Sequence, residues 1–203
     1  MTKAEIKVID FIKKHILLFL LVAVTIIAIS LRVCGMDFQS DDFNSFLNSW
    51  WSIIKLNDFT GLATQVGNYN IPYQVIIYLM TLLPLNALYA YKIVSIIFDF
   101  VLAISTAMLV YSFANNNRRL KTILTYSAVL LSATVIFNSS FWAQCDSIYT
   151  SFIILAILFL HKGKPIASFV FIGIAFAFKL QTVFIIPVLL YYWISTKKIS
   201  ILH

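Results

Sequence analysis

The sequence carries little charge for its length. Of its 203 residues, only 11% are Asp, Glu, Lys or Arg, whereas 61% are hydrophobic; a soluble domain carries about 25% charged residues. This composition excludes an ordinary soluble domain and indicates an integral membrane protein. The 15 basic residues outnumber the 8 acidic ones. They lie in short clusters between apolar runs, however, which is typical of membrane topology and argues against a nucleic-acid partner.

Cysteine, glycine and proline are also scarce. The two cysteines, Cys34 and Cys145, lack the spacing of a metal site or a disulfide framework. Both are expected near the outer boundary of the membrane, so a single bridge stays open beside the simpler interpretation as two unpaired thiols. With 5 glycines, 4 prolines and neither a Gly/Ser-rich linker nor an internal repeat, residues 1–203 are expected to form one membrane domain.

Apolar runs of spanning or near-spanning length recur along the chain. They cover residues 14–34, 71–90, 92–113, 121–139, 147–161, 165–178 and 182–195. We therefore expect an all-α, polytopic transmembrane bundle of about six membrane helices, within a range of five to seven. The N-terminal run lacks a small-residue cleavage site, so we expect an uncleaved first membrane helix, with a cleaved secretory signal as the alternative.

The basic clusters predict how the chain is threaded. The positive-inside rule places four clusters, and the N-terminus with them, in the cytoplasm. They comprise Lys3, Lys7, Lys13, Lys14, Arg118, Arg119, Lys121, Lys162, Lys164, Lys197 and Lys198. The chain must then cross an odd number of times between residue 34 and the second cluster. We expect 71–90, which contains Pro84 and Asn86, to be a re-entrant or surface helix, although a layout in which it spans stays open.

This threading leaves one sizeable extracytoplasmic segment, residues 35–91. Within it, apolar residues recur at helical spacing and predict an amphipathic helix near 42–56 that lies along the outer membrane surface. They are Phe43, Phe46, Leu47, Trp50, Trp51 and Ile54. The paired tryptophans suit the headgroup level of a bilayer.

Two adjacent carboxylates, Asp41 and Asp42, precede this helix. Either aspartate, or Ser40 before them, is expected to cap the first turn. A carboxylate held at the lipid–water boundary also suits a general base or a divalent-cation ligand. The pair is compatible with Mg²⁺ or Mn²⁺ but requires neither, and no metal ligand is assigned. Two adjacent aspartates allow one to cap while the other faces a substrate.

Three further charged residues lie in or beside apolar runs. Asp146 stands at the mouth of a membrane helix and marks a cavity or a cap. Asp99, near mid-membrane, has to be neutral, hydrated or paired, and Lys179 is an available partner. Lys179 could alternatively meet a lipid-linked phosphate.

With these residues in view, the chain resembles the GT-C class of polytopic glycosyltransferases, and within it the bacterial proteins similar to GPI mannosyltransferases. The resemblance rests on five stretches in order, together with Pro187. They are SDDF at 40–43, NYNIPY at 68–73, YKIVSIIFD at 91–99, WAQCDSIY at 142–149 and FAFKLQ at 176–181. The pattern departs from the class at Asp41 and Ala143, where glycine is usual, and at Phe43, where tyrosine is usual.

The resemblance implies an integral membrane glycosyltransferase of the bacterial plasma membrane. Such an enzyme transfers a hexose, with mannose as the leading candidate, from a polyprenyl-phosphate donor to an extracytoplasmic lipid or glycan acceptor. It implies Asp42 as the catalytic base, with Asp41 as the alternative. The implied substrate-binding residues are Asp146, Lys179, Gln144, Trp142 and Tyr69. Because members of the class usually continue through further membrane helices, an inactive truncated relative or a membrane scaffold is the alternative, and a transporter is a more distant one.

Overall fold

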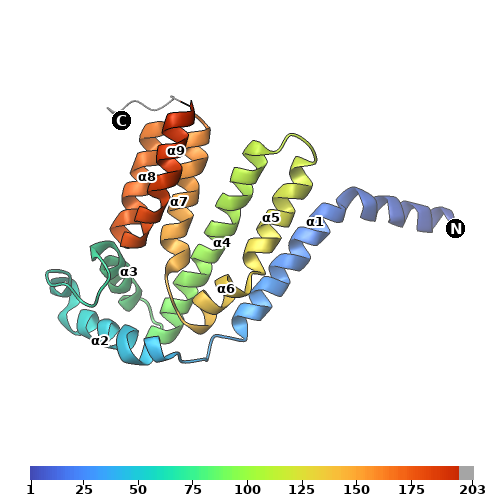
Figure 1. Ribbon diagram of the computed structural model, residues 1–203. Coiled ribbons are helices and arrows are strands. Elements are labelled where there is room, and N and C mark those ends of the chain that lie inside the picture. The colour runs from blue at the N-terminus through green and yellow to red at the C-terminus, as the bar shows by residue number, and fades with distance from the viewer. Residues whose placement is uncertain (197–203) are drawn as a thin grey trace.

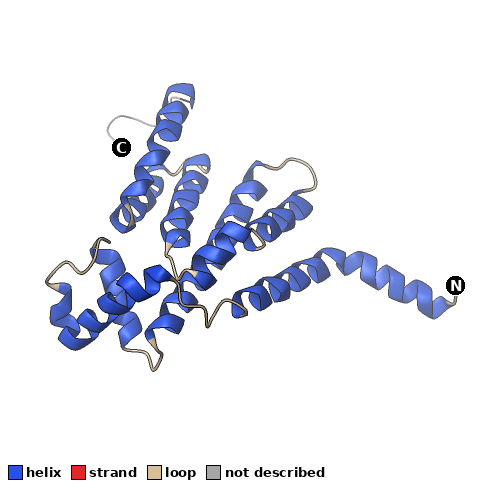
Figure 2. Cartoon of the chain, turned by 60° about the horizontal axis from the view of Figure 1, so that its bottom comes forward, coloured by secondary structure: helices blue, strands red, loops and turns tan. Residues whose placement is uncertain are grey.

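The computed structural model describes residues 1–196 and contains helices and loops, with no strand in that range (Figure 2). The helices of 13 or more residues are α1 (Lys3–Val33), α4 (Ala87–Phe113), α5 (Arg118–Leu130), α7 (Asp146–His161) and α8 (Pro165–Phe178), and α9 (Ile186–Thr196) has 11 residues. The shorter ones are α2 (Asn48–Asn57), α3 (Ile71–Thr81) and α6 (Ala133–Ile136), with π-helical turns at Phe43–Leu47 and Phe137–Phe141 and 3₁₀ turns at Asp58–Leu62 and Leu180–Ile185. The predicted all-α class is confirmed for these residues.

The long helices alternate in direction. Helices α4, α5, α7, α8 and α9 run up and down in turn, α1 lies beside α5, and α2 and α3 gather at one end (Figure 1). Helix α7 packs between α4 and α8. Helices α8 and α9 form a hairpin whose tip lies near Lys179.

Fewer helices than expected are long enough to cross a membrane. Within residues 1–196, α1 and α4 have the required length and apolar character, and α5 together with Ala133–Phe141 forms a third candidate bent by 49°. The other apolar helices are short: α7, for example, has 16 residues, or roughly 24 Å at 1.5 Å per residue, against a hydrocarbon core of about 30 Å. The predicted six crossings are therefore not established by the helix lengths.

The predicted amphipathic helix forms, but its apolar face packs against protein. Its backbone is π-helical over Phe43–Leu47 and α-helical over Asn48–Asn57. Trp50 and Trp51 are 9% and 6% exposed and contact a core cluster that includes Tyr73 and Tyr91. Helices α3 and α4 supply the apolar surface that covers this tryptophan pair, and its placement at the headgroup level stays a prediction.

Charge separates along the helix axes. The turns after α4 and α7 lie at one end, where the rings of Phe113 and His161 are 3.8 Å apart. The N-terminus of α5 and the α7–α8 turn bring Arg118, Arg119, Lys121, Lys162 and Lys164 to this end, which we call the basic end. The opposite end carries Asp37, Asp41, Asp42, Asp58 and Asp146 together with Lys55, Lys92 and Lys179, and we call it the acidic end for its excess of carboxylates. Lys197 and Lys198, also predicted to be cytoplasmic, lie outside the described residues.

Candidate functional site

A cavity of about 540 Å³ opens at the acidic end of the helices. Four segments that are distant in sequence form it: the start of the helix after α1, the loop before α3, the loop before α7 and the break after α8. Its lining residues are Asp42, Asn68, Tyr69, Asn70, Asn138, Trp142, Gln144, Asp146, Phe178, Lys179, Leu180 and Gln181. All of the predicted site residues except Asp41 therefore border one cavity.

Asp42 is oriented by hydrogen bonds that cross the cavity. The Gln144 side-chain amide donates from Nε2 to Asp42 Oδ2 at 2.6 Å, and its Oε1 accepts from the Tyr69 hydroxyl at 2.9 Å. Asp42 is partly buried, and no residue within 1–196 donates to its second oxygen, Oδ1. One carboxylate oxygen is thus held in place while the other remains available to a substrate hydroxyl.

Ser40, and neither aspartate, caps the helix that begins at Asp41. The Ser40 hydroxyl accepts from the backbone N–H of Phe43 at 3.1 Å, and the Ser40 carbonyl accepts from the N–H of Asn44. Asp42 makes no side-chain capping bond. Of the three residues that could have capped, the structure selects the serine, which leaves both carboxylates outside the capping role.

Asp41 borders a smaller hollow that Asp42 shares, but it does not border the larger cavity. It is exposed and lines a hollow of about 320 Å³ together with Phe38, Gln39, Ser40, Asp42 and Trp142. Asp42 and Trp142 border both this hollow and the larger cavity. The preceding aspartate, Asp37, accepts a hydrogen bond from the Tyr89 hydroxyl at 2.6 Å. The geometry thus gives the three neighbouring aspartates three different environments.

Lys179 and Asp146 form an ion pair on the far wall of the cavity. The Lys179 side chain is 20% exposed, and its ammonium lies 5.5 and 5.6 Å from the ring centroids of Tyr69 and Tyr149. The second oxygen of Asp146 accepts from Asn138 Nδ2 at 3.0 Å. Lys179 was one available partner for Asp99, but the two do not pair. Helix α8 ends at Phe178, so the lysine lies at the tip of the α8–α9 hairpin, at the acidic end.

Two neutral groups beside the cavity stay protonated at physiological pH. Burial, reinforced by the nearby Cys145 and Asp146, raises the pKa of the Tyr69 phenol well above its usual range. Burial also raises the pKa of the Cys145 thiol to about 11, although Lys179 opposes that shift. Tyr69 therefore acts as a hydrogen-bond donor. Cys34 and Cys145 are both unpaired, as the simpler interpretation expected.

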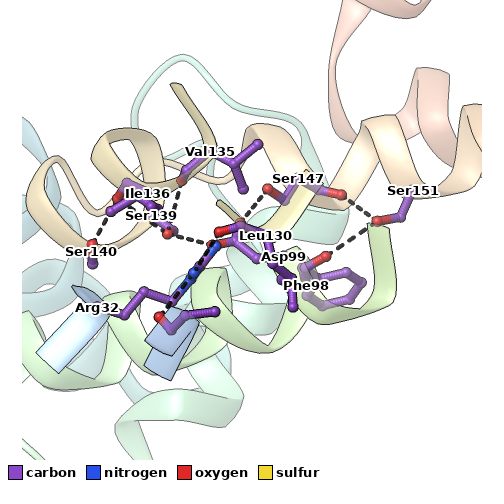
Figure 3. A network of polar contacts seen from close by, with 11 residues as sticks. Arg32, Phe98, Asp99, Leu130, Val135, Ile136, Ser139, Ser140, Ser147 and Ser151 are labelled. Carbon is purple, nitrogen blue, oxygen red and sulfur yellow. Dashed lines mark hydrogen bonds and ion pairs between the residues drawn. The ribbon is translucent and has the colours of Figure 1, made fainter. Parts of the chain in front are cut away.

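Asp99 holds both ends of the loop that lines the cavity. Its Oδ2 accepts from the Ser139 hydroxyl and its Oδ1 from the Ser147 hydroxyl (Figure 3). These serines directly follow Asn138 and Asp146, the two residues that contact each other in the cavity wall. Asn138 was not among the site residues predicted from the sequence. The run Asn138-Ser139-Ser140 within an apolar stretch was the signal that could have identified it, because buried polar groups need partners.

The loop between these serines contains a strained residue. Ala143 has φ 57° and is fully buried, a left-handed conformation that glycine adopts without steric cost. A glycine at this position would therefore relieve the strain. Ala143 is held in place by its N–H, which donates to the Ser139 carbonyl.

Three of the four carboxylate oxygens of Asp42 and Asp146 accept hydrogen bonds from side chains. Both oxygens of Asp146 accept hydrogen bonds, from Lys179 and Asn138, and Asp42 Oδ2 accepts one from Gln144. Within residues 1–196, no group of three or more His, Cys, Asp or Glu side chains is placed to hold a metal ion. Asp41 and Asp42 both border the smaller hollow, and their compatibility with Mg²⁺ or Mn²⁺ stays a prediction.

Comparisons with known proteins add no assignment: no protein-family model matches the sequence, and no match is found among curated proteins or among solved structures.

Proposed function

We propose that this protein is an integral membrane glycosyltransferase that transfers a hexose from a polyprenyl-phosphate donor to an acceptor hydroxyl at the acidic end of its helices. The observation that carries the proposal is the presence of Asp42 and Lys179 on one cavity of about 540 Å³. This volume lies within the range of about 300–1,000 Å³ that is typical of ligand pockets. Transfer of a sugar from a phosphate to a hydroxyl uses a base, which takes the hydroxyl proton, and a cation, which stabilises the leaving phosphate. Asp42 and Lys179 would supply these two groups.

The donor would enter beside Lys179. Its ammonium is a point charge suited to a phosphate oxygen, and the adjoining Phe178 and Leu180 offer apolar surface to the first units of a polyprenyl chain. Asp146 and the rings of Tyr69 and Tyr149 hold the ammonium in the cavity wall before a donor binds. The leaving phosphate gains charge as the glycosidic bond breaks, so a nearby cation stabilises the transition state.

The acceptor would approach from the hollow lined by Asp41. Asp42 and Trp142 separate this hollow from the larger cavity, so an acceptor hydroxyl placed there would meet Asp42 Oδ1 on its way to the anomeric carbon. Asp42 takes the hydroxyl proton as the oxygen attacks, and Gln144 keeps the carboxylate oriented. Asp41 would contact the acceptor without acting as the base.

The orientation of the chain follows from its charge distribution. We propose that the basic end faces the cytoplasm and the acidic end faces outward, with the N-terminus cytoplasmic, because basic loops remain on the cytoplasmic side. We further propose that α1, α4, α5 with α6, α7, α8 and α9 make the six crossings, since they alternate in direction (Figure 1). Helix α3, with 11 residues, stays at the acidic end.

The buried charges weigh against a transporter. Asp99 and Arg32 are 0% and 1% exposed and pair with each other. Neither lines any of the cavities described here. The charges that are accessible in the cavity gather at one end, which suits a reaction site better than a pathway across the membrane.

Transfer of labelled sugar tests the proposal. Membranes containing the native chain, Asp42→Asn or Asp41→Asn at equal protein level would receive a radiolabelled polyprenyl-phosphate hexose and a panel of lipid and glycan acceptors. We expect transfer by the native chain, a loss of about 10²- to 10⁴-fold with Asp42→Asn, and retained transfer with Asp41→Asn. Equal loss in both variants would contradict the assignment of the base, and no transfer by the native chain with any hexose would overturn the proposed activity.

A further inference from the structure

The basic end contains a second cavity that the proposed reaction does not use. It has a volume of about 450 Å³ and lies between the N-terminal half of α1 and the first turns of α5, with Tyr111 of α4 at its side. Its lining residues are Lys13, Lys14, His15, Ile16, Leu17, Leu18, Tyr111, Arg119, Thr122 and Ile123. Three cations thus share one cavity with a group of apolar side chains.

The cavity forms because α1 and α5 are joined at only one end. Near the acidic end the two helices meet through Ala28 and Leu130, and a hydrogen bond of 3.0 Å joins Thr25 Oγ1 to the Tyr126 hydroxyl. Toward its N-terminus α1 turns away from the other helices (Figure 1). The space that opens there is lined by Lys13 and Lys14 on one side and by α5 on the other.

The cations in this cavity lack counter-ions. Among residues 1–196, no carboxylate lies within ion-pair distance of Lys13, Lys14 or Arg119. Arg118 behaves differently: its guanidinium lies 5.6 Å from the Tyr111 ring centroid and donates to the Ala114 carbonyl. Arg119 is therefore the arginine of this turn that remains available to an external anion.

Helix α5 adds to the positive potential. It begins at Arg118 with no side-chain cap from Asn117, so the positive end of its dipole lies one residue before Arg119 of the cavity lining. Helices α1 and α5 run in the same direction, as the contacts from Thr25 to Tyr126 and from Arg32 to Leu130 show. The two basic clusters, about 100 residues apart in sequence, are thereby brought to one place.

We propose that this cavity binds an anionic glycerophospholipid, with its phosphate between Lys13, Lys14 and Arg119 and the start of an acyl chain along Leu17 and Ile123. Basic pockets between membrane helices on the cytoplasmic side bind anionic lipid headgroups. The apolar part of the lining distinguishes a lipid from a free phosphate ion, because a small anion would gain nothing from it. The site does not depend on the proposed transferase activity.

Native mass spectrometry of the full chain in non-ionic detergent measures this binding directly. Dioleoyl phosphatidylglycerol is titrated as the anionic probe and dioleoyl phosphatidylcholine as the zwitterionic control. The test variant combines Lys13→Gln, Lys14→Gln and Arg119→Gln. The matched control combines Lys3→Gln, Lys162→Gln and Lys164→Gln, which removes the same charge outside the cavity. Each basic residue near an anionic lipid contributes about 1 kcal/mol, and every 1.4 kcal/mol changes the dissociation constant roughly tenfold. The test variant should therefore bind phosphatidylglycerol about 100-fold more weakly.

A charge-preserving variant shows whether a loss of binding results from the lost charge or from misfolding. Lys13→Arg, Lys14→Arg and Arg119→Lys together should retain binding of phosphatidylglycerol, and the matched control should stay within about threefold of the native chain. Equal weakening in the test and control variants would show diffuse attraction and overturn the proposal. So would equal affinity for the two lipids, or full displacement of phosphatidylglycerol by an equal concentration of glycerol 3-phosphate, since that would identify a site for free phosphate.

Discussion

Arg32 of α1 and Asp99 of α4 form a buried ion pair, with Arg32 Nε 2.9 Å from Asp99 Oδ2 (Figure 3). The pair links four segments. Arg32 Nη1 also donates to the carbonyl of Leu130 at the end of α5, and Asp99 accepts from Ser139 and Ser147 at the two ends of the cavity loop. A charge pair inside the bundle therefore supports the wall of a cavity at its end.

Removing one member of this pair should destabilise the protein strongly. Asp99→Leu leaves the Arg32 guanidinium buried without its counter-ion, and we expect a loss of about 3–5 kcal/mol in the free energy of unfolding. The double variant Arg32→Met with Asp99→Leu should lose less than Asp99→Leu alone, because no charge is then buried. Thermal unfolding in detergent measures both. Similar losses in the single and double variants would show that the loop hydrogen bonds, and not the charge, determine the stability.

Gln144 should matter for the reaction because it orients Asp42. Gln144→Leu removes the hydrogen bonds to Asp42 and to Tyr69. A hydrogen bond to a charged group is worth about 1.5–3 kcal/mol, so the rate of sugar transfer should fall by roughly 10- to 100-fold. Gln181→Leu is the matched control, since Gln181 lines the same cavity without contacting Asp42. A similar loss in both variants would mean that cavity polarity, and not the orientation of Asp42, sets the rate.

Gly67 should tolerate no side chain, because Trp50 packs directly against it. A Cβ at Gly67 would lie 2.3 Å from Trp50 Cε2, so Gly67→Ala has to displace the loop that carries Asn68 and Tyr69. Gly163 provides a close control: it too has a left-handed backbone, with φ +72° against +76°, but nothing lies within 4 Å of its Cβ position. Both alanine variants incur the same backbone strain, and Gly67→Ala should lose about 1–3 kcal/mol more through overpacking. Equal unfolding temperatures would contradict the close approach.

The reactivity of Cys145 should report on the cavity. Its thiol is 5% exposed and its burial-raised pKa is about 11, and only the thiolate reacts with a maleimide. In a Cys34→Ser background, the alkylation rate should rise about tenfold for each pH unit from 7 to 10, because the thiolate fraction is still small throughout that range. Mass spectrometry of labelled protein measures the rate. A plateau near pH 9 would show that the thiol has an ordinary pKa and that the cavity loop opens to solvent.

Lys179 can be tested by the same reaction. Because its positive charge lowers the pKa of Cys145, Lys179→Gln should slow the alkylation at pH 8, while Lys179→Arg should leave the rate nearly unchanged. A faster reaction in Lys179→Gln would instead indicate that loss of the ion pair with Asp146 opens the loop.

Much of the local structure was predictable from sequence. Apolar periodicity located α4, α7 and α8 to within a few residues, except that α4 begins at Ala87 and not near residue 92. The amphipathic pattern located the helix after Ser40. These predictions succeed because spacing on a helix depends only on neighbouring residues. The pattern did not reveal which surface the apolar face would contact, and Trp50 packs on protein where lipid was expected.

The pairing of charges depended on tertiary structure. The apolar helix required Asp99 to be neutral, hydrated or paired. The basic residues outside the predicted cytoplasmic clusters were Arg32, Lys55, Lys92 and Lys179. Lys92 in fact donates to the carbonyls of Gly35 and Met36 after α1, and Lys179 pairs with Asp146. Which charged residues pair depends on how far apart the helices lie, and the sequence of one helix does not specify that distance.

The sequence by itself determined that this protein is helical, apolar and asymmetric in charge, because each of these properties is a sum or a period over local residues. Only the tertiary structure decided that Asp42, Gln144, Asp146 and Lys179 border one cavity and that Asp41 faces another. Asp41 and Asp42 are adjacent in the chain, yet successive residues on a helix point about 100° apart, given 3.6 residues per turn. Packing against the loop before α7 then determined which of the two carboxylates entered the cavity.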